Sequence, residues 1–354
     1  MKKYEIVEQT LRGEITSRIL KPGDKLPDLE QLCERFEVSH ITIQKALANL
    51  TKAGYLARIK SKGTFVQDNR AKESAGTLAM IISVIERNDT TLLSTIKGAQ
   101  NEAAQQGFTF LLEITDGYEE SERKAIATLA QSNVDGLLLY LNHEKLAYQM
   151  LGGQSDMRGK LPYVMLDHYE TNRPCSSVTA NNTNGGFLAT EYLLKQGHSR
   201  IAYLYTNLSK NTEFDRYSGY RDAMGAYGLK EDAVCMHEEE TAALPELLKR
   251  IRAGELTAAF AVNDRVALRT LHYLYESGVR VPDDFSLLGF DDSHEAEFAI
   301  VPLTTMRQDF FEVGVGAVKL LKEMLNEAEP AQMYKKVFLP TRLVVRNSVK
   351  ELNQ

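Results

Sequence analysis

The stretch VSHITIQKALANL, residues 38–50, decides the N-terminal part of the fold. Its apolar residues recur at helical spacing, at Ile43, Ala46, Leu47 and Leu50, so the pattern predicts a helix with one buried face. Ser39 stands directly before this helix and is its expected N-cap. The opposite face offers short hydrogen-bonding groups with little negative charge, at His40, Thr42, Gln44, Lys45 and Asn49. The surrounding sequence has to indicate what this polar face binds.

The flanking residues predict two more helices and a hairpin. A first helix is expected from Tyr4 to Ile19, with one apolar face made of Ile6, Val7, Leu11, Ile15 and Ile19. A short helix follows at Leu29 to Phe36, with Asp28 as its N-cap. After Gly54, the run YLARIKSKGTFV predicts a hairpin with a basic tip at Lys60 to Gly63. Helix, short helix, turn, helix and hairpin together make a winged helix-turn-helix.

Charge is distributed unevenly along the chain. The 354 residues carry a net charge of −6, with 43% hydrophobic residues, which is ordinary for a globular protein. Residues 1–73 hold 14 Lys and Arg against 10 Asp and Glu, giving +4, so the remaining residues carry −10. A basic module joined to an acidic one suits local binding of a polyanion. The three cysteines lie far apart and predict neither a disulfide framework nor a metal site.

From residue 77 onward, strands alternate with helices. Apolar runs such as TLAMIISVI, FTFLLEI, DGLLLYL and AAFAVND predict buried parallel strands, each followed by an amphipathic helical stretch. About 280 residues of this pattern favour two lobes rather than one sheet. The expected domains are 1–67 for the winged helix-turn-helix, 68–76 for a polar linker and 77–354 for the two lobes, with crossovers between lobes near 180, 307 and 338. The fold class is α/β.

Polar residues stand at the ends of several predicted strands, where parallel sheets bind their ligands. They are Glu86, Asp116, Asp167, the pair Asn263 and Asp264, and the pair Asp291 and Asp292. Carboxylates and amides suit the hydroxyl groups of a sugar, because each forms paired hydrogen bonds. A pair of catalytic carboxylates is the competing interpretation. The chain lacks the common hydrolase, P-loop and zinc-protease motifs, and the glycines of NNTNGG, residues 181–186, suit close helix packing. We therefore expect no enzyme, no cofactor and no metal.

Residues 26–66 resemble the DNA-binding domain of the gluconate-repressor (GntR) type. The resemblance is carried by VS at 38–39, by T-I-x-K-A-L at 42–47 and by KGTFV at 62–66. It implies that the helix of residues 38–50 reads the major groove of DNA, with the wing tip on a phosphate or in the minor groove. The expected DNA-binding residues are Ser39, His40, Thr42, Gln44, Lys45, Lys62 and Gly63.

The chain departs from that pattern where the family usually has arginine. Glu30, His40 and Gln44 stand at those positions. Glutamine pairs with adenine rather than guanine, and each missing arginine removes a phosphate or guanine contact. We predict a divergent operator and a modest affinity for each half-site.

Most of residues 160–325 resemble the effector domain of the lactose/galactose-repressor family, which is related to periplasmic sugar-binding proteins. NNTNGGFLATEYLLKQGHSRIAYL, DRYSGYRDAM, AVNDRVAL, GFDD and PLTTMRQDF carry this resemblance. It implies a periplasmic-binding-protein-like fold with parallel sheets, and an effector site made of Asp167, Arg216, Asn263, Asp291 and Gln308. Phe290, Tyr118 and Tyr169 are candidates for stacking on a sugar face. The pairing of the two modules is similar to the arabinose-responsive repressors.

The sequence thus predicts a cytoplasmic homodimeric repressor that binds double-stranded DNA and is controlled by a mono- or disaccharide between its lobes. A purine or nucleoside effector is the alternative within this class. A sugar-binding transport protein is opposed by the N-terminal winged domain and the lack of a signal peptide. A sugar-processing enzyme is the third possibility, and turnover of a bound sugar would reveal it.

Overall fold

The computed structural model describes residues 3–16, 19–52, 54–59, 62–67, 75–83, 90–152, 161–169, 174–236, 243–326 and 334–352. The chain divides into two compact units, Met1–Ala75 and Gly76–Gln354. Most of the predicted linker lies outside the described residues, and its last residue, Gly76, opens a strand.

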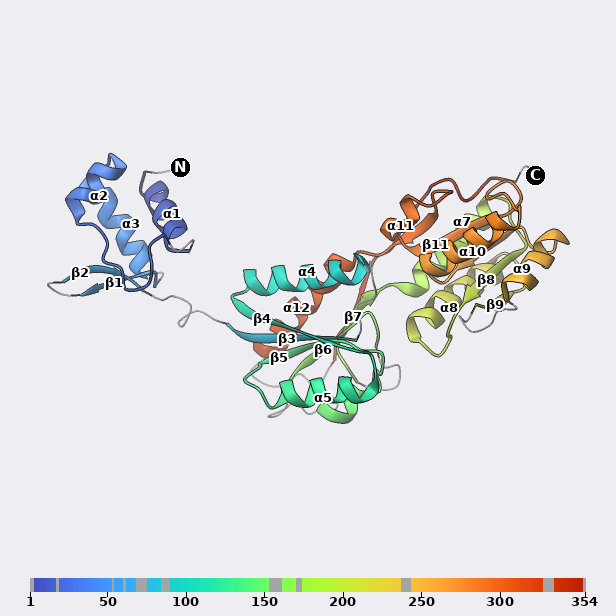
Figure 1. Ribbon diagram of the computed structural model, residues 1–354, viewed down its shortest axis with the longest axis horizontal. Coiled ribbons are helices and arrows are strands. Elements are labelled where there is room, and N and C mark those ends of the chain that lie inside the picture. Colours follow the sequence, from blue (N-terminus) through green and yellow to red (C-terminus); the bar gives the residue numbers. More distant parts are fainter. Residues whose placement is uncertain are drawn as a thin grey trace. The chain divides into compact units, whose positions relative to one another are not determined.

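The first unit is a three-helix domain with a hairpin (Figure 1). Its elements are α1 (Lys3–Thr16), α2 (Leu29–Phe36), α3 (His40–Lys52), β1 (Leu56–Ile59) and β2 (Gly63–Val66), with β1 antiparallel to β2. Its core is built from one side of each element, and Leu11, Leu32, Ile43 and Leu50 are fully buried. Asp28 caps α2 in a capping box with Gln31, as predicted.

The predicted apolar face of the first helix is partly wrong. Val7, Leu11 and Ile15 are buried, but Ile6 is 46% exposed and Ile19 is 71% exposed. The helix as described ends at Thr16, so Ile19 does not continue its periodicity. Ile6 precedes Val7 by one residue, which is about 100° around the helix, and it therefore points away from the core.

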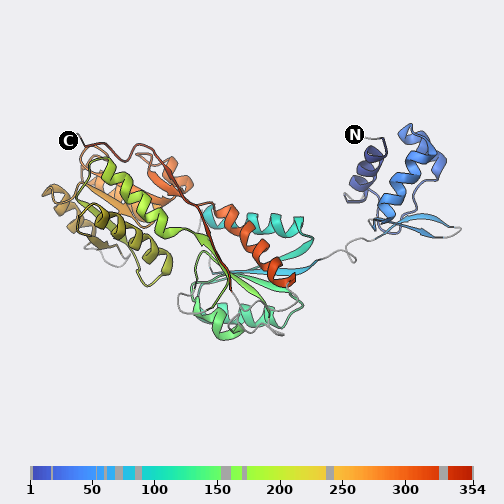
Figure 2. The ribbon, with the colours of Figure 1, turned by 180° about the vertical axis from the view of Figure 1, so that it is seen from behind.

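The second unit contains two six-stranded sheets, each the centre of one lobe. Lobe 1 has the strand order β13-β7-β6-β5-β3-β4, and all its strand pairs are parallel. Its elements are β3 (Gly76–Ser83), α4 (Thr90–Gln105), β4 (Phe108–Thr115), α5 (Glu119–Ala130), β5 (Gly136–Tyr140), α6 (Lys145–Leu151), β6 (Tyr163–Leu166), β7 (Ser177–Ala180), α12 (Phe310–Asn326) and β13 (Lys336–Leu339). Figures 1 and 2 show α4 and α12 beside each other on one face of this sheet, with α5 on the other face.

Lobe 2 has the strand order β14-β12-β11-β10-β8-β9, and only its edge strand β14 runs antiparallel. Its elements are α7 (Asn182–Lys195), β8 (Ile201–Tyr205), α8 (Asn211–Ala226), β9 (Ala233–Cys235), α9 (Ala243–Arg252), β10 (Ala258–Ala261), α10 (Asp264–Glu276), β11 (Ser286–Asp291), α11 (His294–Glu297), β12 (Thr304–Arg307) and β14 (Arg342–Val344). The chain passes between the two sheets after β7, after β12 and after β13.

Glycines allow one pair of helices in each lobe to pack closely against each other. A Cβ added at Gly186 in α7 would lie 2.2 Å from the backbone oxygen of Arg216 in α8, and one at Gly219 would lie 2.0 Å from that of Thr183. Gly98 in α4 and Gly314 in α12 pack in the same way. The prediction that Gly186 serves close helix packing is confirmed.

The strand FTFLLEI was predicted to be buried, and this is wrong for most of its residues. In β4, Leu111, Leu112 and Ile114 are between 40% and 49% exposed. The reason is position, because β4 is the edge strand of the lobe 1 sheet and pairs only with β3. Sequence alone does not tell an edge strand from a central one when both are apolar.

Candidate functional site

The N-terminal end of α3 presents the predicted DNA-binding residues. Ser39, His40, Gln44 and Lys45 are exposed, and Thr42 is half-buried. The backbone oxygen of Ser39 accepts hydrogen bonds from the backbone N–H groups of Thr42 and Ile43, at 3.0 and 3.2 Å. Its hydroxyl lies 3.0 Å from that of Thr42. These contacts start the helix and leave its first turn open to a partner.

Two side chains of α3 are engaged with α1. The Nζ of Lys45 lies 4.1 Å from the ring centre of Tyr4, and Asn49 donates a hydrogen bond of 3.0 Å to Glu8. Asn49 therefore joins the helices rather than offering its amide to an outside partner. Lys45 is exposed, and the Tyr4 ring orients its amino group at the surface.

The hairpin tip is described in part, because Lys60 and Ser61 lie outside the described residues. Lys62 is exposed, and its backbone N–H donates to Ile59 at 3.0 Å. Gly63 has a φ of +118°, and a Cβ at this position would lie 2.7 Å from Cε of Lys25. Gly63 thus serves the backbone turn, and Lys25 adds a basic side chain at the wing that the sequence analysis missed.

Ile41 was also missed. It is 77% exposed, more than any other large apolar side chain among the described residues. Ile41 stands between the predicted DNA-binding residues His40 and Thr42, but helical periodicity identifies only the apolar residues of the buried face.

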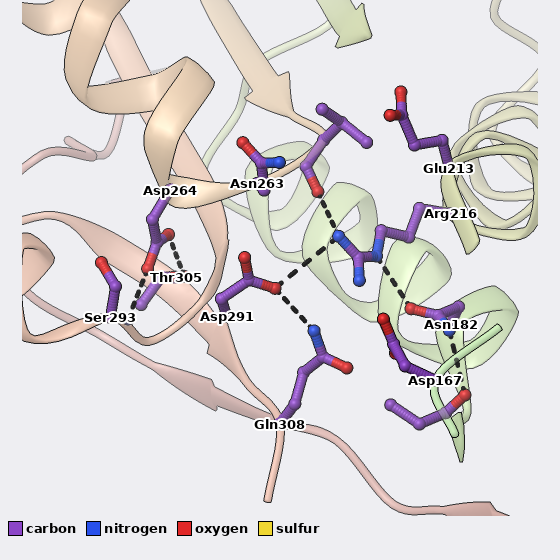
Figure 3. Close-up of polar contacts among 12 residues, drawn as sticks. Asp167, Asn182, Glu213, Arg216, Asn263, Asp264, Asp291, Ser293, Thr305 and Gln308 are labelled. Carbon is purple, nitrogen blue, oxygen red and sulfur yellow. Dashed lines mark hydrogen bonds and ion pairs between the residues drawn. The ribbon is translucent and has the colours of Figure 1, made fainter. Parts of the chain in front are cut away.

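A polar cluster in the second unit brings together three of the predicted effector residues (Figure 3). Asp291, the last residue of β11, accepts a hydrogen bond of 2.6 Å from Nε2 of Gln308, and its Oδ1 lies 3.7 Å from Nη1 of Arg216. Arg216 is 5% exposed, and Gln308 is equally buried. The three residues come from β11, α8 and the segment after β12, so the sheet and the glycine-packed helix place them.

Arg216 is held in position from three sides. Its Nε donates to Asn182 at 2.8 Å and its Nη1 donates to the backbone oxygen of Val262 at 2.7 Å. Its guanidinium carbon lies 4.0 Å from the ring centre of Phe290. Phe290 is fully buried, so its predicted role as a sugar-stacking surface is wrong. Asn182 is absent from the predicted site, because NNTNGG indicates glycine packing and does not reveal the contact of this asparagine with Arg216.

Asp167 contributes a carboxylate from lobe 1 to the same group of residues (Figure 3). Its Oδ1 is buried and has no hydrogen-bond partner among the described residues, and the same is true of Oε1 of Gln308. Asp167 and Asp291 have φ angles of +62° and +119°. Such conformations cost of order 1–3 kcal/mol in a residue with a side chain and concentrate at functional sites. Two buried acceptors without partners, one of them on a residue with a strained backbone, indicate a ligand site.

Other strand-end residues serve the fold. Asn263 uses its side-chain oxygen to cap α10, accepting from the N–H of Val266 at 2.9 Å. Asp264 is 1% exposed and accepts from the hydroxyl of Thr305 and the N–H of Ser293, at 2.6 and 2.7 Å. Burial, and then the charge of Asp291, raise the pKa of Asp264 to about 8.

The remaining strand-end residues lie elsewhere or are already paired. Asp292 forms ion pairs with Arg307 and Arg346. Asp116 is exposed and accepts from the hydroxyl of Ser121 in α5 and from the N–H of Tyr118; these hydrogen bonds, that of Ser121 first, lower its pKa. Tyr118 is 73% exposed. Glu86 lies outside the described residues.

A pocket of about 390 Å³ opens between the lobes. It is lined from lobe 1 by residues that include Asn142, His143 and Glu144, and from lobe 2 by Asn207, Ser209 and Lys210. His168 connects it to the polar cluster, since its Nδ1 lies 3.5 Å from Glu144 and its Nε2 lies 3.8 Å from Asp167.

Tyr169 is a further link between the lobes. Its hydroxyl donates to Asp215 of α8 at 2.6 Å, and its backbone oxygen accepts from Asn211. Lys336 lies over its ring, 4.3 Å from the centre. Burial and the neighbouring carboxylate raise the pKa of Tyr169, which keeps this hydroxyl a donor.

Within the described residues, no three His, Cys, Asp or Glu side chains are grouped as a metal site would need. None of the described helices is both long and apolar enough to cross a membrane.

Two families match the chain. Bacterial regulatory proteins of the gntR family match residues 3–66, and the periplasmic binding protein-like domain matches residues 190–349. The "Arabinose metabolism transcriptional repressor" of Geobacillus stearothermophilus is 28% identical over 99% of this chain and 98% of its own length. The "HTH-type transcriptional repressor PurR" of Vibrio campbellii is 33% identical over 79% of this chain and 83% of its own.

Among solved structures, the "transcriptional regulator CelR-cellobiose complex" is similar, with a TM-score of 0.67 and 27% identity over 88% of this chain and 91% of that one. These relatives are transcription regulators and not enzymes. Together with the winged head and the two-lobed fold, they show that the chain belongs to the bacterial transcriptional repressors that join a GntR-type DNA-binding domain to a periplasmic-binding-protein-like effector domain.

Proposed function

We propose that the protein acts as a homodimer on a palindromic operator and that a mono- or disaccharide bound between its lobes controls operator affinity. Residues 1–67 form the DNA-binding domain, residues 68–76 the linker and residues 77–354 the effector and dimerisation domain. The α3 face and the wing contact DNA through Ser39, His40, Thr42, Gln44, Lys45 and Lys62, with Gly63 shaping the wing. The protein works in the cytoplasm, where a bacterial operator lies.

The observation that carries the effector proposal is the unfinished hydrogen bonding around Arg216. Asp167 Oδ1 and Gln308 Oε1 are buried acceptors without partners among the described residues; Asp167 follows β6 of lobe 1, and Gln308 stands in the crossing directly after β12 of lobe 2. A buried unsatisfied acceptor costs ~1–3 kcal/mol, so a ligand with several hydroxyl donors relieves that cost. Sugar hydroxyls have this chemistry, and Arg216 with Asp291 adds a donor and an acceptor. Asn263 offers its amide group beside them.

The aromatic side chains favour a sugar over a purine or nucleoside. A purine needs a slot between two apolar or aromatic walls. Of the candidates, Phe290 is buried beneath Arg216, and the Tyr169 ring is covered by Lys336. Tyr118 stands exposed at the start of α5. A relative's name also supports the sugar, since the Geobacillus stearothermophilus repressor is named for arabinose metabolism.

Control of operator affinity follows from the two-lobed site. A ligand that bonds Asp167 of lobe 1 and Asp291 of lobe 2 together favours one arrangement of the lobes. Coupling of this kind is typically worth ~1–3 kcal/mol, which changes operator occupancy several-fold or more. The three chain crossings between the sheets provide the hinge.

Exposed apolar side chains support the homodimer. In lobe 2, Tyr275, Phe298 and Ile300 are between 59% and 70% exposed, beside a pocket of about 390 Å³ that Tyr275 and Ile300 line. In lobe 1, the exposed apolar residues of β4 form an unpaired sheet edge. Such surfaces cause aggregation unless a partner covers them. A second copy covers both and brings two α3 helices to two half-sites.

A thermal-shift screen tests the effector proposal. Full-length protein is heated with L-arabinose and other pentoses, with hexoses, disaccharides, sugar phosphates and nucleosides. A ligand at 100 times its Kd adds ~2.7 kcal/mol of stability and raises Tm. We expect a sugar to give this shift and nucleosides to give none. A shift with nucleosides alone would overturn the sugar assignment.

Two variants assign the two sites separately. Asp291→Ala is expected to abolish the sugar shift and to leave operator binding without sugar intact. Lys45→Ala is expected to weaken operator binding several-fold and to leave the sugar shift unchanged. Glu246→Ala removes an exposed carboxylate of α9 in lobe 2 and serves as a control that changes neither. Unaltered responses in Asp291→Ala and Lys45→Ala would mean that the two sites lie elsewhere.

A further inference from the structure

Helix α3 carries one exposed isoleucine that hydrogen bonding by its polar face does not explain. Ile41 is 77% exposed, whereas Ile43, Ala46 and Leu50 of the same helix are fully buried. An apolar side chain of this size in water gains nothing from its position unless a partner covers it. Single exposed apolar residues are common on protein surfaces, but Ile41 stands among the residues predicted to bind DNA, so a contact in the bound state gives its side chain a use.

Helix geometry places Ile41 at the centre of the exposed face. Each residue turns the helix by 100°, so Ile41 lies opposite the average direction of Ile43, Ala46 and Leu50. Gln44 and Lys45 follow it by three and four residues and share its face, and both are exposed. The apolar group is thus flanked by an amide and an ammonium group on the surface that enters the groove.

The major groove offers one apolar group for such a side chain. Thymine carries a C5 methyl on its groove edge, whereas the other groups there are hydrogen-bond donors and acceptors. An amide side chain pairs with the N6 and N7 atoms of adenine. A face with Ile41 beside Gln44 is complementary to neighbouring A·T pairs, and Lys45 adds a positive charge for the backbone.

We propose that Ile41 is a specificity-determining residue of operator recognition, and that its side chain contacts the C5 methyl of a thymine next to an adenine paired with Gln44. This inference rests on the proposal that α3 enters the major groove. The operator half-site therefore contains adjacent A·T pairs where relatives with arginines would favour guanine.

Replacing thymine by deoxyuridine tests the contact, because it removes only the methyl group. The operator is first selected with full-length protein from random duplexes, and its thymines are then replaced one at a time. We expect one position in each half-site at which deoxyuridine weakens wild-type binding by about fourfold, the value of one buried methyl. Ile41→Ala should bind the thymine and deoxyuridine duplexes with equal affinity. The two proteins and two duplexes form a double-mutant cycle that measures the contact between the side chain and the methyl group.

Matched controls separate this contact from changes in folding. Ile41 is exposed, so Ile41→Ala should keep the wild-type Tm. Ile6→Ala removes a half-exposed isoleucine from α1 and should keep the thymine preference. The Ile41–thymine contact would be contradicted if no thymine of the selected operator were sensitive to deoxyuridine, or if Ile41→Ala still distinguished thymine from deoxyuridine. Either result would leave the proposal that α3 enters the major groove intact. Failure to select any sequence would overturn operator reading by α3 as well.

Discussion

Arg216 and its neighbours show how single residues combine two roles in this protein. Asp291 bonds Gln308 and approaches Arg216, and its charge also acts on the buried Asp264. Asp264 in turn holds the backbone of Ser293 and the hydroxyl of Thr305. The effector site is therefore electrostatically connected to a carboxyl group that the fold needs.

The raised pKa of Asp264 predicts a pH dependence of stability. The ordinary pKa of 3.8 rises to about 8 in the folded protein, so the native state binds a proton that the unfolded chain has lost between these values. The stabilising contribution is complete below pH 4 and is lost as the pH rises towards 8. The free energy of unfolding should fall by up to ~1.4 kcal/mol for each pH unit in this interval. Asp264→Asn cannot titrate and should remove this part of the slope.

Urea unfolding at pH 5, 6, 7 and 8 checks this expectation. Wild type should lose stability relative to Asp264→Asn as the pH rises. Glu246→Gln, at an exposed position of α9 in the same lobe, should follow wild type. Parallel curves for wild type and Asp264→Asn would show that Asp264 keeps an ordinary pKa.

At the scale of elements, the glycine contacts between α7 and α8 determine where Arg216 lies. Gly219→Ala would place a Cβ 2.0 Å from the backbone oxygen of Thr183 and 2.6 Å from the backbone nitrogen of Phe187. Backbone atoms cannot turn aside, so α8 must shift. We expect a loss of ~1–3 kcal/mol of stability and weaker sugar binding, because α8 carries Arg216. Urea unfolding and the sugar thermal shift measure the two effects.

Gly225→Ala is the matched control on the same helix. Nothing lies within 4 Å of a Cβ at this position. Alanine in place of glycine inside a helix is worth up to ~1 kcal/mol, so this variant should be slightly more stable and should bind sugar normally. If both variants behaved alike, the close packing of α7 on α8 would not control the site.

Sequence predicted the elements better than their surroundings. The bounds of α2, including its cap at Asp28, follow from local hydrogen-bonding chemistry and matched the structure. The apolar strand β4 was predicted as buried, since its composition does not reveal that it lies at a sheet edge. Nothing in the sequence showed that Phe290 lies beneath Arg216, because this contact joins distant segments. The cap that Asn263 forms on α10 is local, since its side-chain oxygen accepts from the N–H of Val266 three residues later, and the sequence therefore contained that signal.

For the whole molecule, assembly is the property with the widest effect. Ile300→Asp places a charge in the exposed apolar surface of lobe 2, where Ile300 is 61% exposed. We expect sedimentation velocity to show a monomer where wild type is a dimer. Operator affinity should fall at least tenfold, because a monomer carries one DNA-binding domain instead of two. The sugar thermal shift should persist, since each protomer holds its own cluster.

Tyr227→Ser is the matched control. It removes an exposed aromatic side chain at the end of α8, outside the proposed interface, and it should leave the dimer intact. A dimeric Ile300→Asp variant with normal operator binding would exclude this surface as the interface.

The two-lobed architecture itself was predictable, because alternating strands and helices over about 280 residues leave few other arrangements. How two copies meet was not, since exposure is a property of the folded surface.

The discontinuity of lobe 1 along the chain has a consequence for biosynthesis. Helix α12 and strand β13 complete this lobe, yet a ribosome reaches them only after it has made the first five strands of the lobe 2 sheet. Until then, β7 has an open side, and the face of the sheet that α4 covers lacks its second helix, α12. The nascent polypeptide must therefore protect an unfinished sheet, and a premature stop between β12 and β13 would release a product that chaperones and proteases recognise.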